Sequence, residues 1–278
     1  MTGLSRKWLV GASAAVMLGA VLPGAQAATV AAPQAATVAA TRATAVGPLT
    51  GIVIAIDPGH QLGNSNPAFG RQLSQTYFVG GSVGVKFCNT TGTATSGPHS
   101  LAESTYNFYV AQDLRAALQR LGATVVMTRT VDSWNAWGPC VWNRGAFGGL
   151  HHAALEVSIH ADGGPTWGRG FFVIEPSGIT VPCYKHPRPA RMVPLSRALG
   201  GSIIRGMQGV GLRTSNYITG GVLTEGNQAT LNCSSVPTVI VETLNMPNST
   251  DAALARSAAG RAKVALGLLR GIRLYLRR

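Results

Sequence analysis

The chain has 278 residues and a formal net charge of +13, although only 12% of its residues are charged. This balance indicates a basic surface rather than a polyelectrolyte. It favours an anionic partner such as a wall polymer or a membrane surface, with solubility alone as the alternative. Nucleic acid is not an expected partner, because no helix-turn-helix, zinc-finger or aromatic RNA-binding motif is visible.

The first segment, residues 1–27, predicts a signal peptide. Arg6 and Lys7 precede an apolar stretch from Trp8 to Leu22, and the segment ends in Ala25-Gln26-Ala27. These features follow the order of a positive region, an apolar region and a cleavage site. About fifteen apolar residues are few for a bilayer span. We therefore expect a protein secreted to the cell wall or a periplasm-like space, with a retained N-terminal anchor as the alternative.

Residues 28–48 consist largely of Ala, Thr, Val and Pro, which predicts a flexible lead-in. The remaining residues, 49–278, suit a single α/β domain with a sizeable core. No internal repeat or second linker is visible, so we do not expect a separate wall-binding module.

Strands and helices alternate along this domain. Short apolar runs rich in β-branched residues predict strands at 52–56, 123–127, 155–159, 171–174 and 238–241. Helical spacing predicts helices from Ser100 to Gly122, from about 191 to 207, and from Asp251 onward. The alternation predicts a mixed, mostly parallel sheet with helices on both faces. A long Gly- and Asn-rich excursion over 61–99 is typical of a functional loop.

Polar residues follow three of the predicted strands. His60, His160 and Glu242 lie at carboxyl ends of strands, where open α/β sheets bind ligands, and Glu103 lies in the first turn of a helix. Two imidazoles and a carboxylate are a typical catalytic zinc shell. Taken alone, however, Ser100 and Glu103 also fit a capping box, S-x-x-E, and a single histidine after a strand is more often structural.

The residues around these positions resemble a known family. In chain order the matching segments are Ile56-Asp57-Pro58-Gly59-His60, Glu103, Thr128-Arg129, Val157-Ser158-Ile159-His160-Ala161-Asp162 and Val239-Ile240-Val241-Glu242. Together they resemble the zinc-dependent N-acetylmuramoyl-L-alanine amidases of the Amidase_3 family, from about Ile52 to the end. The segment 88–93 looks like the secreted actinobacterial branch.

The resemblance implies one zinc ion per chain held by His60, Glu103 and His160, with Glu242 as the catalytic carboxylate. For Glu103 this implication outweighs the capping box. The implied reaction is hydrolysis of the amide between N-acetylmuramic acid and L-alanine in peptidoglycan. The alternatives are a zinc peptidase that cuts stem peptides and a non-catalytic peptidoglycan-binding protein of the same fold.

The resemblance also makes Asp57 and Arg129 supporting residues rather than catalytic ones. The sequence departs from the family after Glu242: Leu244 stands where many relatives have a glycine. A glycine would permit a positive φ at this position, so the substitution affects the expected geometry of the loop. The other histidines match no ligand position and are expected at the surface or beside the site: His99, His151, His152 and His186.

The chain has four cysteines after the predicted signal peptide. An even number in a secreted chain favours disulfides, and the absence of a C-x-x-C pair argues against a thiolate zinc cluster. Their positions in loops predict the pairs Cys88–Cys140 and Cys183–Cys233.

The last predicted helix has apolar residues every three or four positions from Leu254. Up to Leu269 this pattern predicts a helix that packs on the sheet. Arg270 to Arg278 then carries four arginines in nine residues and no acid. We expect this basic tail to contact anionic wall polymer or lipid headgroups.

Overall fold

The structure is a computed structural model that describes residues 47–88, 92–178 and 181–278. The predicted signal peptide, nearly all of the lead-in and part of the segment 88–93 therefore lie outside the described residues. Among those described, no helix has the length and apolar character needed to cross a membrane.

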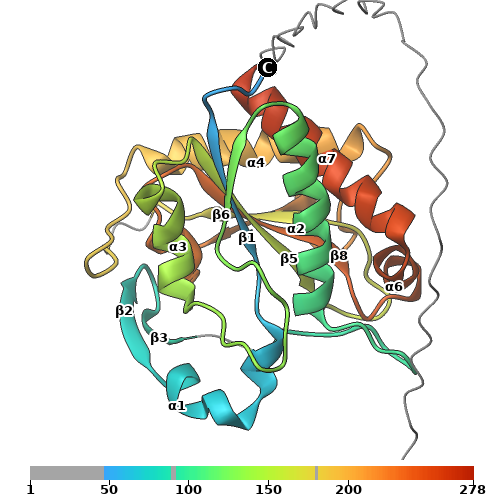
Figure 1. The fold of residues 1–278 in the computed structure, drawn as a ribbon, viewed down its shortest axis with the longest axis horizontal. Helices are drawn as coiled ribbons and strands as arrows, with labels where there is room; N and C mark the ends of the chain where they lie inside the picture. The colour runs from blue at the N-terminus through green and yellow to red at the C-terminus, as the bar shows by residue number, and fades with distance from the viewer. Residues whose placement is uncertain (1–46, 89–91, 179–180) are drawn as a thin grey trace, which may run out of the picture. The chain divides into compact units, whose positions relative to one another are not determined.

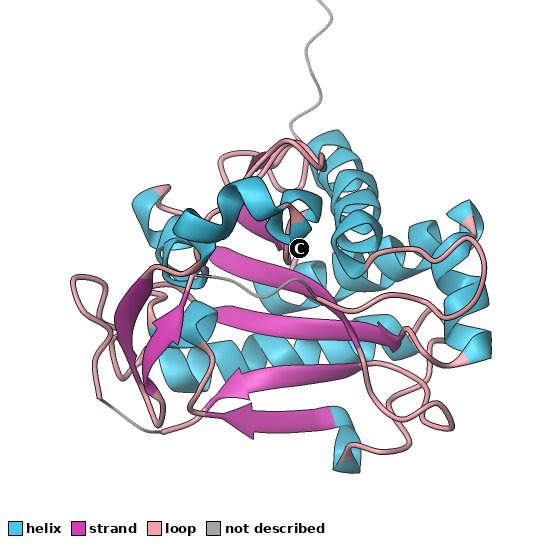
Figure 2. Ribbon diagram, turned by 90° about the horizontal axis from the view of Figure 1, so that it is seen from below, coloured by secondary structure: helices cyan, strands magenta, loops and turns pink. Residues whose placement is uncertain are grey.

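A six-stranded sheet in the order β4-β1-β5-β8-β6-β7 forms the centre of the domain (Figures 1 and 2). Its strands are β1 (Val53–Pro58), β4 (Thr124–Met127), β5 (Leu155–Asp162), β6 (Phe172–Pro176), β7 (Val222–Glu225) and β8 (Thr238–Asn245). Among the described strand pairs of this sheet, only β6–β8 is antiparallel. The predicted mostly parallel sheet is therefore confirmed, and the carboxyl ends of β1, β5 and β8 meet at one edge.

Helices cover both faces of this sheet, as predicted, and Figure 1 shows α2 and α3 on opposite sides of β1. One face carries α2 (Glu103–Arg120), α4 (Met192–Gln208), α6 (Ser249–Arg256) and α7 (Ala258–Leu276). The other face carries α3 (Val141–Leu150) and α5 (Ala229–Asn232). Both faces of the central strands are thus shielded from water, which explains their continuous apolar runs.

Side chains along β5 point alternately to the two faces of the sheet, so they lie in two environments. Val157 and Ile159 pack into the main core beneath α2, α4 and α7. Glu156 and Ser158 face the α3 side, where Gly148 donates from its backbone to Glu156 Oε2 at 3.0 Å. Because side chains alternate along a strand, His160 projects to this same side.

Glu156 is a carboxyl group buried completely in the sheet. Burial raises its pKa well above the ordinary value, and the charge of Asp57 adds to the shift. A raised pKa in the folded state means that the stability from this group is present below its unfolded pKa and is lost as pH rises.

We therefore expect Glu156→Gln to gain stability over the wild type as pH rises from about 4 to 8, because the amide stays neutral. Thermal melts across this pH range measure the difference. Asp113→Asn, the same change at an exposed carboxylate on α2, is the control. A constant difference between Glu156→Gln and wild type at all pH values would contradict the expectation.

The excursion 61–99 is more regular than its composition predicts. Beyond two short turns, Leu62–Ser65 and Pro67–Phe69, it contains α1 (Gly70–Leu73) and an antiparallel hairpin, β2 (Thr76–Gly80) and β3 (Gly84–Phe87), visible at the lower left of Figure 1. Gly80 and Gly84 have positive φ, so the glycines that suggested a loop form the turn of the hairpin.

The sequence analysis also missed α3, because glycines lower helix propensity. Tertiary packing requires them here. A Cβ on Gly145 would lie 2.6 Å from the Thr230 carbonyl oxygen, and one on Gly148 would lie 2.7 Å from Glu156 Oε2. The glycines let α3 approach α5 and the sheet closely, and the contacts outweigh the local preference.

Both predicted disulfides, Cys88–Cys140 and Cys183–Cys233, are confirmed. The four cysteines form a separate small core with Val79, Trp142 and Ala229. The first disulfide joins the end of the hairpin to the start of α3. The second joins the segment after β6 to the end of α5.

The C-terminal helix is divided at Ser257, which ends α6 and caps α7 by accepting a hydrogen bond from Gly260 N. Its apolar face is buried in the main core chiefly against α2 and α4, whereas the sequence predicted packing on the sheet. That face extends further than predicted, because Ile272 is completely buried. Arg270 to Arg278 is therefore not a separate tail: most of it is the last part of α7.

Candidate metal centre

His60, Glu103 and His160 come together at the carboxyl edge of the sheet, as the sequence predicts. One ligand atom from each lies within 4.8 Å of the others. The two oxygens of Glu103 lie 3.2 Å from His60 Nε2 and 3.0 Å from His160 Nδ1. The two imidazole rings are edge to face, with centroids 4.8 Å apart. Two nitrogens and a carboxylate at such separations fit a zinc ion with an open fourth position.

The motif before His60 has a steric reason. A Cβ on Gly59 would collide with the imidazole of His160, so only glycine allows this ring to lie against the loop. Gly59 N donates to the Ile159 carbonyl at 2.9 Å, and His60 then turns the chain with a φ of +58°. The loop after β1 thus places both histidines beside each other.

Glu103 is oriented by three donors from different segments. Its carboxylate accepts hydrogen bonds from Thr93 N at 2.9 Å, Ala161 N at 3.1 Å and Asn107 Nδ2 at 3.3 Å. Burial alone would raise the pKa of Glu103, but the charges and hydrogen bonds of His60 and His160 outweigh burial and hold it well below the ordinary value.

The interpretation of Ser100 and Glu103 as a capping box is wrong. The residue before α2 is Ala102, which makes no side-chain cap, and Ser100 Oγ donates to the Thr95 carbonyl instead. Glu103 is therefore free of the reciprocal capping contact. Its carboxylate faces the histidines, which favours the ligand interpretation. Asn107, one turn later on the same helix, was missed, although a polar residue at this spacing on an apolar face was a signal.

Glu242 lies beside His160, because the two residues pair in the β5–β8 ladder. Burial raises the pKa of Glu242 well above its ordinary value, and the charges of Glu103 and Asp162 raise it further. Among the described residues, its buried Oε2 has no hydrogen-bond partner. A buried carboxylate oxygen without a partner can accept a hydrogen bond from a water molecule or a substrate.

A cavity of about 450 Å³ joins these groups. His60, His160 and Glu242 lie along its wall, and residues of β3 and the β2–β3 turn face them. Its remaining lining is mostly apolar: Val83, Val85, Phe87, Val141, Ile174 and Ile240. The hairpin within the excursion therefore forms one side of the candidate site, consistent with the prediction of a functional loop.

Asp57 is a buried support, as expected. Its carboxylate accepts from Arg144 Nη1 and from Ser158 Oγ, each at 2.6 Å. Burial raises its pKa, but Arg144, Ser158 and Thr128 outweigh this effect and lower it to about 2. The ionised carboxylate holds Arg144, a residue that the sequence analysis missed. Arg144 in turn donates to the His60 carbonyl at 2.7 Å.

Arg129 supports the other side of the same loop. Its guanidinium donates to the Pro58 carbonyl at 2.9 Å and to the Ser104 carbonyl at 2.6 Å, and it pairs with Asp132 at 3.1 Å. These bonds tie the loop that carries His60 to the first turn of α2. Arg129 thereby fixes two candidate ligand segments relative to each other.

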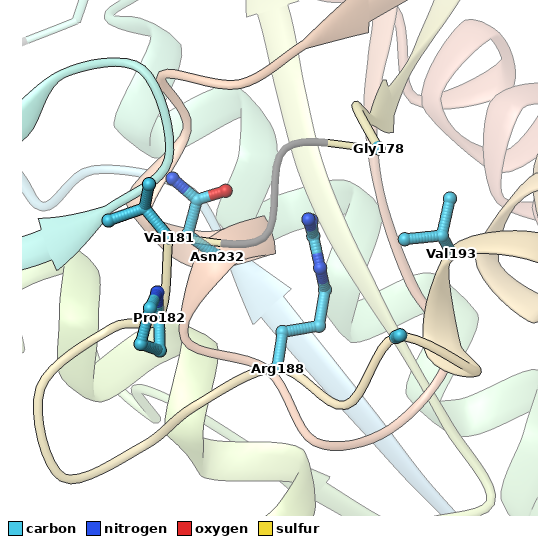
Figure 3. Close-up of a pocket in the computed structure, with 7 residues that line it drawn as sticks. Gly178, Val181, Pro182, Arg188, Val193 and Asn232 are labelled. Carbon is cyan, nitrogen blue, oxygen red and sulfur yellow. The ribbon is translucent and has the colours of Figure 1, made fainter.

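The remaining sequence features lie outside the centre. Leu244, which stands in place of a glycine, has no positive φ and packs in the main core, so β8 continues through it. His99, His151 and His152 are exposed, and His186 is half-buried. Another cavity, of about 150 Å³, contains Arg188 and Asn232 but none of the candidate ligands (Figure 3).

Comparisons with known proteins identify the family of the chain. The family Amidase_3, N-acetylmuramoyl-L-alanine amidase, matches residues 54–273. The N-acetylmuramoyl-L-alanine amidase Rv3717 of Mycobacterium tuberculosis is 35% identical over 229 residues, which are 82% of this chain and 88% of that protein. In the crystal structure of the N-acetylmuramyl-L-alanine amidase Ami1 from Mycobacterium smegmatis, the matching chain is 32% identical in sequence, with a TM-score of 0.72. The match covers 82% of the present chain and 98% of the Ami1 chain.

The apo form of Ami1 from Mycobacterium abscessus is also 32% identical, with a TM-score of 0.71 over 82% of this chain and 100% of that chain. Both the sequence match and the structural matches extend over nearly the whole described domain. The chain belongs to the Amidase_3 family of N-acetylmuramoyl-L-alanine amidases.

Proposed function

We propose that the protein hydrolyses the amide bond between N-acetylmuramic acid and L-alanine in peptidoglycan. One zinc ion would be held by His60, Glu103 and His160, with Glu242 as the catalytic acid and base. The observation that carries this proposal is the cluster of His60, Glu103 and His160 beside a cavity that His60, His160 and Glu242 line, in a chain of this family.

When bound, zinc supplies a Lewis acid for the amide carbonyl and lowers the pKa of water. Glu242 accepts the proton of the attacking water at its buried carboxylate and returns it to the departing amine of L-alanine. A carboxylate whose pKa is raised toward neutrality suits both transfers. The products are a glycan strand and a free stem peptide.

Mass spectrometry of digested wall fragments tests this reaction. We expect stem peptides that begin with L-alanine, together with muramic acid that has lost its peptide. A stem-peptide peptidase would instead release shortened peptides and leave L-alanine attached to the sugar. A binding protein without activity would release neither product.

We also propose that the protein acts outside the cytoplasm after loss of residues 1–27. Two disulfides support this location, because such bonds persist in oxidising compartments. N-terminal sequencing of the mature protein distinguishes cleavage after Ala27 from a retained anchor.

A second partner is proposed for a basic concave surface at the end of α7. We call it the arginine groove; its arginines are Arg205, Arg270, Arg273, Arg277 and Arg278. Within the described part of the chain, no Asp or Glu side chain forms an ion pair with any of them. Arginine binds phosphate groups through its planar fork of donors, so the groove suits an anionic wall polymer, with anionic lipid as the alternative.

Truncation after Leu269 would remove the buried Ile272, so charge substitutions test the groove better. We expect Arg205→Gln/Arg273→Gln/Arg277→Gln to sediment less with purified walls at low salt and to keep its activity on small soluble muropeptides. The difference should shrink near 1 M salt, where the Debye length is about 3 Å.

The matched control removes three exposed arginines elsewhere, in Arg71→Gln/Arg120→Gln/Arg191→Gln. Equal loss of sedimentation in both variants would show an effect of net charge alone and refute a specific groove. Anionic vesicles in place of walls distinguish the lipid alternative.

A further inference from the structure

One side chain of the cavity has a charge that the proposed reaction does not use. Lys86 lies in β3 and lines the cavity together with His160 and Glu242. Burial alternates along this strand: Val85 and Phe87 are 53% and 65% exposed, whereas Lys86 is less exposed than either. Lys86 is therefore more enclosed than Val85 and Phe87, although all three line the same cavity.

An enclosed ammonium group is costly unless it has a partner. Burial lowers the pKa of Lys86, and the negative charge of Glu225 opposes the shift only in part. No ion pair joins Lys86 to a carboxylate in the described ranges. Besides Arg144, which is paired with Asp57, the cavity thus presents a second cation in the same lining as His60, His160 and Glu242.

The chemistry of the substrate offers a matching anion. The scissile amide joins a lactyl and an alanyl group, whose methyl groups suit apolar walls, and the residue after L-alanine in a stem peptide is an isoglutamate that carries a carboxylate or its amide. A lysine forms a strong, charge-assisted hydrogen bond with the carboxylate and only a weaker one with a carboxamide.

We propose that Lys86 is a specificity residue that binds the carboxylate next to the alanine, on the peptide side of the scissile bond. This inference rests on the proposed amidase function. It gives the hairpin a role in substrate selection: stems whose second residue has a free carboxylate are cleaved in preference to amidated stems.

The test compares two soluble substrates, N-acetylmuramoyl-L-alanyl-D-isoglutamate and N-acetylmuramoyl-L-alanyl-D-isoglutamine. We expect the zinc-loaded wild type to show the higher kcat/KM for the acid. Lys86→Met should reduce this selectivity by about tenfold, the order that one hydrogen bond to a charged group supplies, mainly through the KM of the acid. Lys86→Arg should keep most of the preference, and Lys86→Glu should reverse it.

Lys263→Met, which removes a lysine on α7, is the matched control and should leave the selectivity as in the wild type. Three results would overturn the inference: equal losses for both substrates in Lys86→Met, a shifted pH profile of kcat shared by both, or a wild type that prefers the amide. If the wild type releases alanyl peptides from neither substrate, the proposed function fails instead, whatever Lys86 does. Thermal melts confirm that each variant is folded.

Discussion

His160→Ala is expected to abolish stoichiometric zinc binding and, with it, hydrolysis of the wall. Three protein ligands are the usual minimum of a catalytic zinc site, and alanine leaves only His60 and Glu103. The variant should remain folded, because the side chain of His160 is partly exposed and lies at the cavity wall. Elemental analysis after dialysis should fall from about one zinc per chain to nearly none.

His151→Ala provides the matched control, because His151 is exposed at the end of α3 and belongs to no candidate site. Its zinc content and activity should equal those of the wild type. Chelation of the wild type should remove activity, and added zinc should restore it. Unchanged zinc in His160→Ala would refute the assignment of the centre.

Glu242→Gln is expected to retain zinc and lose activity by about 10²–10⁴-fold, the range that general acid–base catalysis supplies. Glutamine has the same size but cannot accept the proton of the attacking water. The fold should not suffer, because burial already disfavours the charged form of Glu242. Turnover on a soluble muropeptide and zinc content, measured on one preparation, separate the two effects.

Glu175→Gln is the control for this substitution. Glu175 lies on the neighbouring strand β6, is buried, and does not line the cavity. It should keep nearly full activity. Near-normal turnover in Glu242→Gln would exclude Glu242 as the proton carrier and leave the zinc assignment untouched.

The sequence determined the central strands and the position of the site. Runs such as Val239-Ile240-Val241 are apolar at every position, which only a strand covered on both faces requires, and a polar residue directly after such a run lies at the ligand-binding edge. This pattern placed His60, His160 and Glu242 at that edge, but only the resemblance of the flanking residues to a known family assigned them as candidate site residues. The four cysteines allow three pairings, and the pairing that we predicted from their positions in loops is confirmed.

Tertiary structure decided what local pattern left open. Ser100 and Glu103 matched a helix cap, yet contacts with Thr93 and two histidines hold the carboxylate elsewhere. The glycines of α3 made the helix that carries Arg144 unrecognisable from local sequence. They are needed because α3 packs closely against other segments.

The enclosure of Lys86 depends on which face of the hairpin meets the domain. A short sequence of alternating residues predicts that two faces exist, but only the packing of the hairpin in the domain determines which face is more enclosed. The sequence thus determined the elements and the polar residues at their ends. The environment of each side chain depended on residues distant in sequence, because burial and charge come from neighbours in space.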